Sequence, residues 1–435
     1  MGFIDTIMVS RGFGPDALAS VALGSAAFFA CLIFGMGVMN AVSPMVSQAF
    51  GANDLPGVGR AYRQGLWLGL LIGLPLFAII RLSPAVLLWM GQDADTVAGT
   101  TGYVRALSWG VFPFLWFIGT RCFVEGVSRP RPATAIALFG VLLNVGANYA
   151  LMFGKLGFPA LGIVGTGWAS AIVFWSNFLI LLLFCLVDTR LRALVDLVHI
   201  RRPDLGYLRE LFRLGAPIGV TQGVEAGLFM LTLMLMGLIS TAAIAAHHMA
   251  IQFAAFTFMV PLGIGLATAV RVGQAVGRGD HDGGRRAGFA GILLAGTFMA
   301  MTAVFIWLFP HEIVSIFIDV DAAEHADVVR LTVLLLGIAA VFQIVDGVQV
   351  SAAGALRGMK DTFVPMLISL VSYWALGLGI GYVLAFRLDL GPAGLWWGLV
   401  AGLGSAALLL TVRFHRVSRR FTSSPAPSGV DTATR

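Results

Sequence analysis

The sequence predicts an all-α integral membrane protein, with twelve transmembrane helices arranged as two six-helix lobes related by a pseudo-two-fold repeat. Three observations predict this fold class: the composition, a series of long apolar stretches and an internal repeat. Of the 435 residues, 58% are hydrophobic and 11% are charged, and the mean hydropathy is +0.89. Soluble domains carry about 25% charged residues. The composition therefore excludes both a soluble domain and a disordered chain.

Eleven apolar stretches are long enough to cross a bilayer, which takes roughly 20 mostly apolar residues. Glycine, proline and charged residues separate them. The stretches cover residues 17–48, 58–80, 95–119, 131–153, 161–187, 207–238, 241–270, 287–310, 328–353, 363–386 and 393–414. A twelfth stretch, Met1–Val9, is apolar apart from Asp5 and Thr6 but is too short to cross.

Basic residues predict the orientation. If Met1–Val9 ends the first helix and the helices alternate in direction, 22 of the 28 Lys and Arg residues lie on the same side as the C-terminus. Cytoplasmic loops are enriched in these residues, so we expect a cytoplasmic C-terminus. The net charge of +6 is then a topology signal, so we expect membrane lipid but not nucleic acid as a partner. We also expect the protein to be a monomer.

The longest basic connection runs from Asp188 to Pro203, near the middle of the chain, and is typical of a cytoplasmic linker. A segment rich in Ser, Pro and Thr ends the chain. The expected organisation is a six-helix lobe at 1–187 with helix 1 incomplete, a linker at 188–205, a second six-helix lobe at 206–415 and a disordered cytoplasmic tail at 416–435.

An internal repeat supports the two-lobe organisation. At an offset of 226 residues, Ser47–Asp54 aligns with Gly273–Asp280, and four of the eight positions are identical. Both copies follow one apolar stretch and precede the next. We expect Gly51 and Gly277 to make the turns, and Asp54 and Asp280 to cap the helices that follow.

The same alignment places Met1–Val9 against the second half of the helix that begins near Tyr207. The start of the first helix would then precede Met1. We therefore expect helix 1 to be N-terminally truncated in this chain. Two tandem halves are typical of transporters with a central cavity.

Three acids lie deep within apolar stretches: Asp5, Glu225 and Asp346. No Lys or Arg lies at comparable depth in the sequence to pair with them. Ionisable residues inside a membrane are costly and by default mark ion or substrate pathways. Such carboxyl groups can hold a proton or a small cation. The alternative is that they are protonated and only hold helices together.

Polar neighbours strengthen two of these acids as candidates. Polar residues recur every three positions around Asp346, and these residues, Gln343, Asp346 and Gln349, share one helix face with Phe342 beside them. Likewise, Gln222 lies three residues before Glu225 on the same face of its helix. Asn177 either lines a cavity or bridges helices. The sequence shows no phosphate-binding glycine loop, so we expect no cofactor and an ion gradient, of Na+ or H+, as the energy source.

Several segments together resemble the multidrug and toxic compound extrusion (MATE) family, NorM-type branch. They are Met1–Met8, Gly14–Ala19, Ser43–Pro44 with Ser47–Ala52, and Asp346–Gly358. The resemblance implies a V-shaped pair of six-helix bundles that exports organic cations and other amphipathic drugs in exchange for Na+ or H+. It also implies that Asp5, Glu225 and Asp346 match functional acids of the family. Phe342 stands where a tyrosine is common, which removes a hydroxyl ligand for Na+.

We therefore predict a non-enzymatic, multi-pass antiporter of the bacterial inner membrane that works by alternating access. The expected ion-coupling residues are Glu225, Asp346 and Asp5, and the first two are candidate Na+ ligands. The expected substrate-binding residues are Asp5, Asp346, Gln343, Gln222, Asn177 and Phe342. The alternatives are a flippase for a lipid-linked precursor, which should have a basic cavity, and an integral membrane enzyme, which should show convergent His, Ser or acidic residues.

Overall fold

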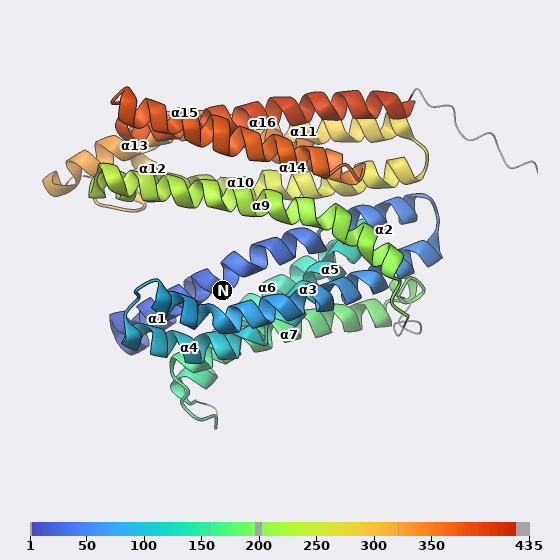
Figure 1. The fold of residues 1–435 in the computed structure, drawn as a ribbon, viewed down its shortest axis with the longest axis horizontal. Helices are drawn as coiled ribbons and strands as arrows, with labels where there is room; N and C mark the ends of the chain where they lie inside the picture. Colours follow the sequence, from blue (N-terminus) through green and yellow to red (C-terminus); the bar gives the residue numbers. More distant parts are fainter. Residues whose placement is uncertain (1, 156, 196–201, 321, 423–435) are drawn as a thin grey trace, which may run out of the picture. The chain divides into compact units, whose positions relative to one another are not determined.

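The protein is described by a computed structural model that covers the whole chain except residues 1, 156, 196–201, 321 and 423–435. All regular structure in the described residues is helical (Figure 1). Ten helices in this part of the chain are long and apolar enough to cross a membrane, and a pair of shorter helices bent by 44° would make an eleventh. The predicted all-helical membrane fold is confirmed.

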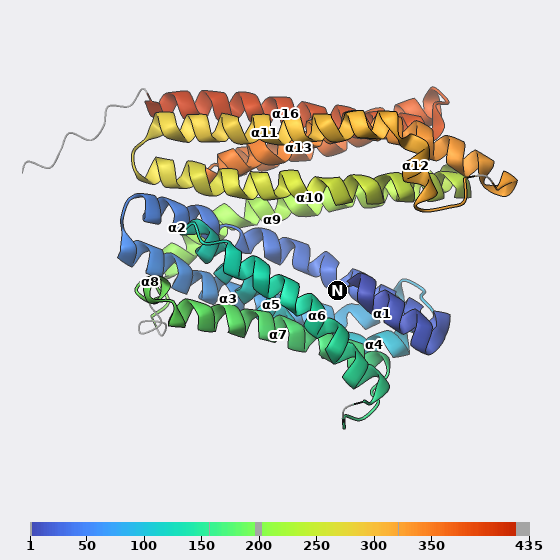
Figure 2. The same ribbon diagram turned by 180° about the vertical axis from the view of Figure 1, so that it is seen from behind.

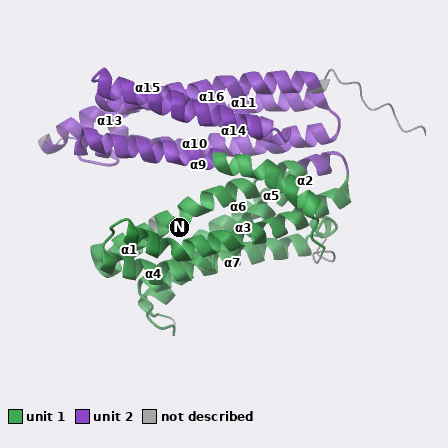
Figure 3. Cartoon of the chain, viewed as in Figure 1, with its two compact units in different colours: residues 1–46, 54–220 green, residues 47–53, 221–435 purple. Residues whose placement is uncertain are grey.

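Unit 1 comprises Met1–Val46 and Asp54–Val220 (Figure 3). Its helices, some continuing into unit 2, are α1 (Gly2–Met39), α2 (Val42–Gly51), α3 (Leu55–Trp89), α4 (Ala94–Ser108), α5 (Val111–Gly126), α6 (Arg131–Phe153), α7 (Ile163–Val187), α8 (Thr189–Arg192) and α9 (Leu205–Ile239). Within the unit, α7 packs on α4, α5 and α6, and α1 packs on α3 and α4.

Unit 2 comprises Ser47–Asn53 and Thr221–Arg435, so it takes the end of α2 and the second half of α9. Its other helices are α10 (Thr241–Gly277), α11 (His281–Leu308), α12 (Pro310–Ser315), η1 (Ala323–His325), α13 (Ala326–Gly358), α14 (Phe363–Leu370), η2 (Val371–Leu378), α15 (Gly379–Tyr382), η3 (Val383–Arg387) and α16 (Gly391–Thr422). Helix α13 is central to the unit, since it packs on α10, α11 and α16 (Figure 2).

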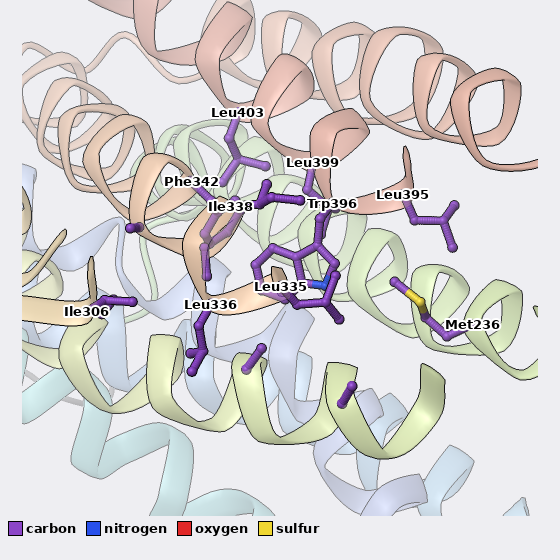
Figure 4. Packing of buried hydrophobic residues seen from close by; sticks show 14 of the residues in the cluster. Met236, Ile306, Leu335, Leu336, Ile338, Phe342, Leu395, Trp396, Leu399 and Leu403 are labelled. Atoms are coloured by element: carbon purple, nitrogen blue, oxygen red, sulfur yellow. The ribbon is translucent and has the colours of Figure 1, made fainter. Parts of the chain in front are cut away.

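The core of unit 2 lies along α13. Phe342 and Trp396 are buried and meet edge to face, with ring centroids 5.7 Å apart. Leu335, Leu399 and Leu403 pack in the same cluster (Figure 4). Aromatic pairs in this geometry add to the stabilisation from apolar burial. The core thus holds α13 and α16 together. Asp346 follows Phe342 by one turn of α13, so it lies next to this core.

From Gly2 onward, the stretch Met1–Val9 lies in a short helical segment, which a non-helical residue separates from the long apolar segment of the same element. Helix α1 starts at Gly2 and is kinked at Gly14, whose φ of 80° lies in the left-handed region, and Pro15 follows. Kinks of this kind are typical of proline, which cannot donate the backbone hydrogen bond of a regular helix. The kink separates Asp5 from the long apolar part of the helix.

The turns of the internal repeat differ from the prediction. Gly51 and Gly277 are the last residues of α2 and α10, and the left-handed turn residues are instead Asn53, with φ 59°, and Gly279, with φ 73°. The prediction that Gly51 and Gly277 make the turns was therefore wrong.

The predicted helix caps are confirmed. The side chain of Asp54 accepts a hydrogen bond from the backbone N–H of Gly57, at 2.9 Å. Asp280 does the same for Gly283, at 2.8 Å. These carboxylates satisfy backbone donors that the first helical turn leaves unpaired.

Close packing explains the repeated glycines. A Cβ atom on Gly51 would lie 2.1 Å from the carbonyl oxygen of Gln274, and a Cβ atom on Gly277 would lie 2.0 Å from that of Gln48. Gln48 and Gln274 are themselves equivalent positions of the repeat. Within unit 2, the two copies of the motif therefore pack reciprocally, glycine of one against glutamine of the other.

A seam of small residues joins α10 to α13. Gly265, Ala269 and Gly273 recur every four residues on α10. A Cβ atom on Gly354 of α13 would lie 2.3 Å from the carbonyl oxygen of Gly265, and one on Gly358 would lie 2.5 Å from that of Ala269. Small residues at this spacing let membrane helices approach closely. The seam sets the position of α13, which carries Asp346.

Two ion pairs, one in each unit, link residues that lie far apart in the sequence. In unit 1, Arg129 donates to Asp188 at 2.7 Å, and in unit 2 Arg413 donates to Asp361 at 2.7 and 3.1 Å. Hydrogen bonds from the backbone N–H of Leu191 and Arg190, together with Arg129, lower the pKa of Asp188.

The end of the chain is more helical than expected. Helix α16 continues to Thr422, so residues 416–422, which we expected in a disordered tail, are helical. Residues 423–435 lie outside the described residues. In the expected linker at 188–205, α8 forms a short helix and α9 begins at Leu205.

Candidate functional site

Glu225 and Asp346 line one cavity in unit 2. The cavity has a volume of about 270 Å³. Glu225 comes from α9 and Asp346 from α13, while α10 supplies apolar wall residues. The complete lining is Glu225, Phe229, Ile251, Ala254, Ala255, Phe258, Phe342 and Asp346. Two carboxyl groups from different helices thus face one small, mostly apolar space.

The two carboxyl groups act on each other electrostatically. Asp346 is only 6% exposed, and its Oδ1 atom has no hydrogen-bond partner among the described groups. Two ionised carboxylates in one apolar cavity repel each other, and a buried charge without a partner is costly. A proton or a cation between them would relieve both penalties.

One cation lies nearer than the sequence indicated. Arg357, in the last turn of α13, interacts electrostatically with Glu225. The sequence alone did not place any Lys or Arg near Glu225. Arg357 follows Asp346 by three helical turns, and counting along the sequence placed it with the loop residues. Only the packing of α9 against α13 brings its charge to Glu225.

Tyr373 was missed by the sequence analysis. It lies in η2, is fully buried and interacts electrostatically with both Glu225 and Asp346. Next to it, the indole N–H of Trp374 donates to the carbonyl oxygen of Val224, at 3.2 Å, which ties η2 to α9 beside Glu225. A polar aromatic residue in an otherwise apolar stretch was the available signal.

The glutamines near these acids have separate environments. Gln343 is fully buried and accepts a hydrogen bond from Thr302 of α11, at 3.1 Å. Neither Gln343 nor Gln222 is among the residues that line the described cavity. Phe342 does line it, with its ring 6.2 Å from that of Phe229.

Asp5 lies in a different cluster, within unit 1. Its carboxyl group is 6% exposed. Asn148 of α6 donates to its Oδ1 atom at 2.6 Å, and Ser170 of α7 donates to its Oδ2 atom at 3.3 Å. Asn144 also interacts with this carboxyl group. A buried carboxyl group surrounded by neutral donors can be either ionised or protonated.

Asn177 lies two turns beyond Ser170 on the same face of α7. It is 5% exposed, and its Oδ1 atom has no hydrogen-bond partner in the described part of the chain. A Cβ atom on Gly140 of α6 would lie 2.4 Å from that oxygen. Each unit therefore holds a buried carboxyl group together with polar atoms that lack protein partners.

The candidate functional groups of the two units are carboxyl groups. The described residues contain no group of three or more His, Cys, Asp or Glu side chains placed to hold a metal ion. What the two units offer are single or paired carboxyl groups in apolar surroundings, which can exchange a proton or a monovalent cation with little rearrangement.

Comparison with known proteins places these features in context. A family model described as MatE matches residues 1–150 and 217–383. A Rhizobium meliloti protein described as "Probable multidrug resistance protein NorM" is 39% identical over 424 residues, covering 98% of this chain and 91% of that protein. A Mesorhizobium japonicum protein with the same description is 40% identical over 417 residues, covering 95% and 89%.

The fold is similar to that of solved structures. One of them, described as "Crystal structure of MATE in complex with MaL6", has a TM-score of 0.87 and 20% sequence identity. The match covers 97% of this chain and 92% of that chain.

Proposed function

The chain belongs to the MatE family, and from this premise we propose that it exports cationic and amphipathic drugs across the bacterial inner membrane by ion-coupled antiport. Relatives of this chain along nearly its whole length are described as multidrug resistance proteins. The coupling ion is Na+ or H+, and the drug leaves as the ion enters. No catalytic step is part of the proposal.

One observation carries the proposal: Glu225 and Asp346 line the same cavity. Their mutual repulsion makes the empty, doubly ionised state unfavourable, so uptake of a proton or Na+ is favourable. Loading neutralises charge that would otherwise attract a cationic drug. Drug and ion therefore weaken each other's binding, which is a positive coupling free energy and is what exchange requires.

Aromatic side chains suit the proposed substrates. Phe229, Phe258 and Phe342 line the cavity of unit 2. Aromatic faces attract organic cations, and apolar surface binds their hydrophobic parts. Asp5 and Asn177 are the corresponding proposed substrate contacts in unit 1, where Asp5 is a second place for a proton or cation.

The identity of the coupling ion depends on the oxygen ligands near Asp346. Phe342 has no hydroxyl group, whereas Tyr373 has one and interacts with both acids. A proton needs only one carboxyl oxygen, but Na+ needs several oxygen ligands. We propose that Tyr373 supplies an oxygen ligand if Na+ is the coupling ion, in place of the tyrosine hydroxyl that Phe342 lacks.

The test is dye efflux from vesicles that contain the purified protein. Proton and Na+ gradients are imposed separately, and ethidium movement is followed for the wild type and Asp346→Asn. We expect Asp346→Asn to abolish ion-driven efflux at an unchanged protein level. Undiminished efflux would remove Asp346 from the mechanism.

A matched control is available on the same helix. Asp327 lies in the first turn of α13, where its side chain is 88% exposed and pairs with Arg330 at 3.5 Å. Asp327→Asn makes the same chemical change far from the cavity, and we expect efflux at the wild-type rate. The alternative, a flippase for a lipid-linked precursor, is less favoured, because the charged residues that line the described cavity are both acids.

A further inference from the structure

In unit 2, α14 and α16 pack against each other (Figure 1). Residues of both helices line a groove. Its volume is about 310 Å³. One wall is formed by Val364 and Ile368 of α14, and the other by Leu409 and Val412 of α16. Leu409 and Val412 are partly exposed. The groove therefore opens outward and has an apolar part.

Three arginines line the other part of the groove. Arg413, Arg416 and Arg420 are three and four residues apart, which places them on one face of α16. Asp361 neutralises Arg413 through two hydrogen bonds. No acidic residue is among the described residues that line the groove. The described lining of the groove is therefore basic, with Arg416 and Arg420 beyond the Arg413–Asp361 pair.

The order of these residues along α16 matches the depth profile of a bilayer. Leu409 and Val412 precede Arg416 and Arg420, so the wall changes from apolar to basic within about three helical turns. Arginine is costly in hydrocarbon and is stable at the level of the lipid headgroups. The apolar part thus lies at the level of acyl chains, and the basic part lies at the level of phosphate groups.

We propose that this groove binds an anionic phospholipid. The phosphate group pairs with Arg416 and Arg420, and the first part of an acyl chain lies against Val364, Ile368 and Leu409. The planar guanidinium group matches phosphate geometry and makes paired hydrogen bonds with it. Basic pockets between membrane helices are known to select anionic headgroups. A cationic drug would be repelled, so this site is separate from the cavity at Asp346.

The test uses the full chain purified in detergent. Phosphatidylglycerol or phosphatidylcholine is added, and retained lipid is measured by native mass spectrometry and by the rise in melting temperature. We expect the wild type to retain phosphatidylglycerol preferentially. Each arginine adds to the attraction for an anionic lipid. We therefore expect the double variant Arg416→Gln, Arg420→Gln to bind phosphatidylglycerol about 30-fold more weakly than the wild type. Restoring the charge with lysine at both positions should recover much of the affinity.

The matched control is Arg419→Gln. Arg419 is on the same turn of α16 but does not line the groove. We expect this variant to bind the lipid as the wild type does. Equal loss in Arg419→Gln, or no loss in the double variant, would overturn the proposal, as would equal retention of phosphatidylcholine.

A second pair of variants tests the apolar part without changing charge. Val412→Trp fills the groove, whereas Leu408→Trp places the same side chain at an exposed neighbouring position that does not line it. We expect only Val412→Trp to reduce lipid retention. Retention by Val412→Trp at the wild-type level would show that no acyl chain occupies the groove.

Discussion

At the scale of single residues, close neighbours fix the polar side chains of the cluster in unit 1. Asn177 of α7 packs against Gly140 of α6, where a methyl group would lie 2.4 Å from the amide oxygen. In the same unit, hydrogen bonds from Asn148 and Ser170 hold the carboxyl group of Asp5 in place. Glycine at 140 is therefore a positioning residue for Asn177.

Gly140→Ala should force Asn177 out of its place. We expect overpacking to lower the free energy of unfolding by about 1–3 kcal/mol and to reduce dye efflux. The measurements are thermal unfolding in detergent and ethidium efflux. Gly146→Ala is the control, because a methyl group at that position of α6 meets nothing within 4 Å. Equal effects of the two changes would contradict this role for Gly140.

At the scale of elements, the close approach of α10 and α13 determines where Asp346 lies. The two helices touch through glycine and alanine, with backbone atoms of one against Cα positions of the other. Without much hydrophobic drive between helices in lipid, association depends on such van der Waals packing. A small shift of α13 along this seam therefore also moves Asp346, which lines the cavity about two helical turns away.

Gly354→Ala tests the seam. Its Cβ atom would lie 2.3 Å from the carbonyl oxygen of Gly265, and a backbone atom cannot turn aside as a side chain does. We expect a lower melting temperature, equivalent to about 1–3 kcal/mol, and slower efflux. Gly263→Ala, on α10 with nothing within 4 Å, should change neither. A stable and fully active Gly354→Ala protein would show that the helices can separate without cost.

At the scale of the whole molecule, the charge pattern predicts the orientation, and the repeat recurs in the local fold. In the predicted topology most basic residues lie on one side, and they include Arg413, Arg416, Arg419 and Arg420 in the last third of α16. The equivalent turn residues Asn53 and Gly279 both have positive φ, and both are followed by a capping aspartate. The two copies of the motif thus fold alike despite different flanking residues.

The orientation predicts the behaviour of fusion proteins. Green fluorescent protein attached after Arg435 should fluoresce, because the positive-inside rule places that end in the cytoplasm. Alkaline phosphatase at the same position should be inactive. In the acidic segment between α12 and η1 the same two reporters should behave in the opposite way. An active phosphatase at the C-terminus would contradict the orientation.

Features that depend on neighbouring residues were predictable from the sequence. The caps at Asp54 and Asp280 were predicted because a side chain three residues before a backbone N–H can reach it in any helix start. The turns were wrongly predicted at Gly51 and Gly277. These glycines instead pack closely against Gln274 and Gln48, which are far away in the sequence, so local sequence could not predict these contacts.

The sequence by itself determined the membrane class, the apolar helices and the depth of Asp5, Glu225 and Asp346, because apolarity and helical periodicity are local properties. Only the tertiary structure decided that Glu225 and Asp346 share a cavity and that Arg357 and Tyr373 act on the same acids. These residues come from α9, α13 and η2, which are far apart in the sequence, so only the packing of these helices brings them together.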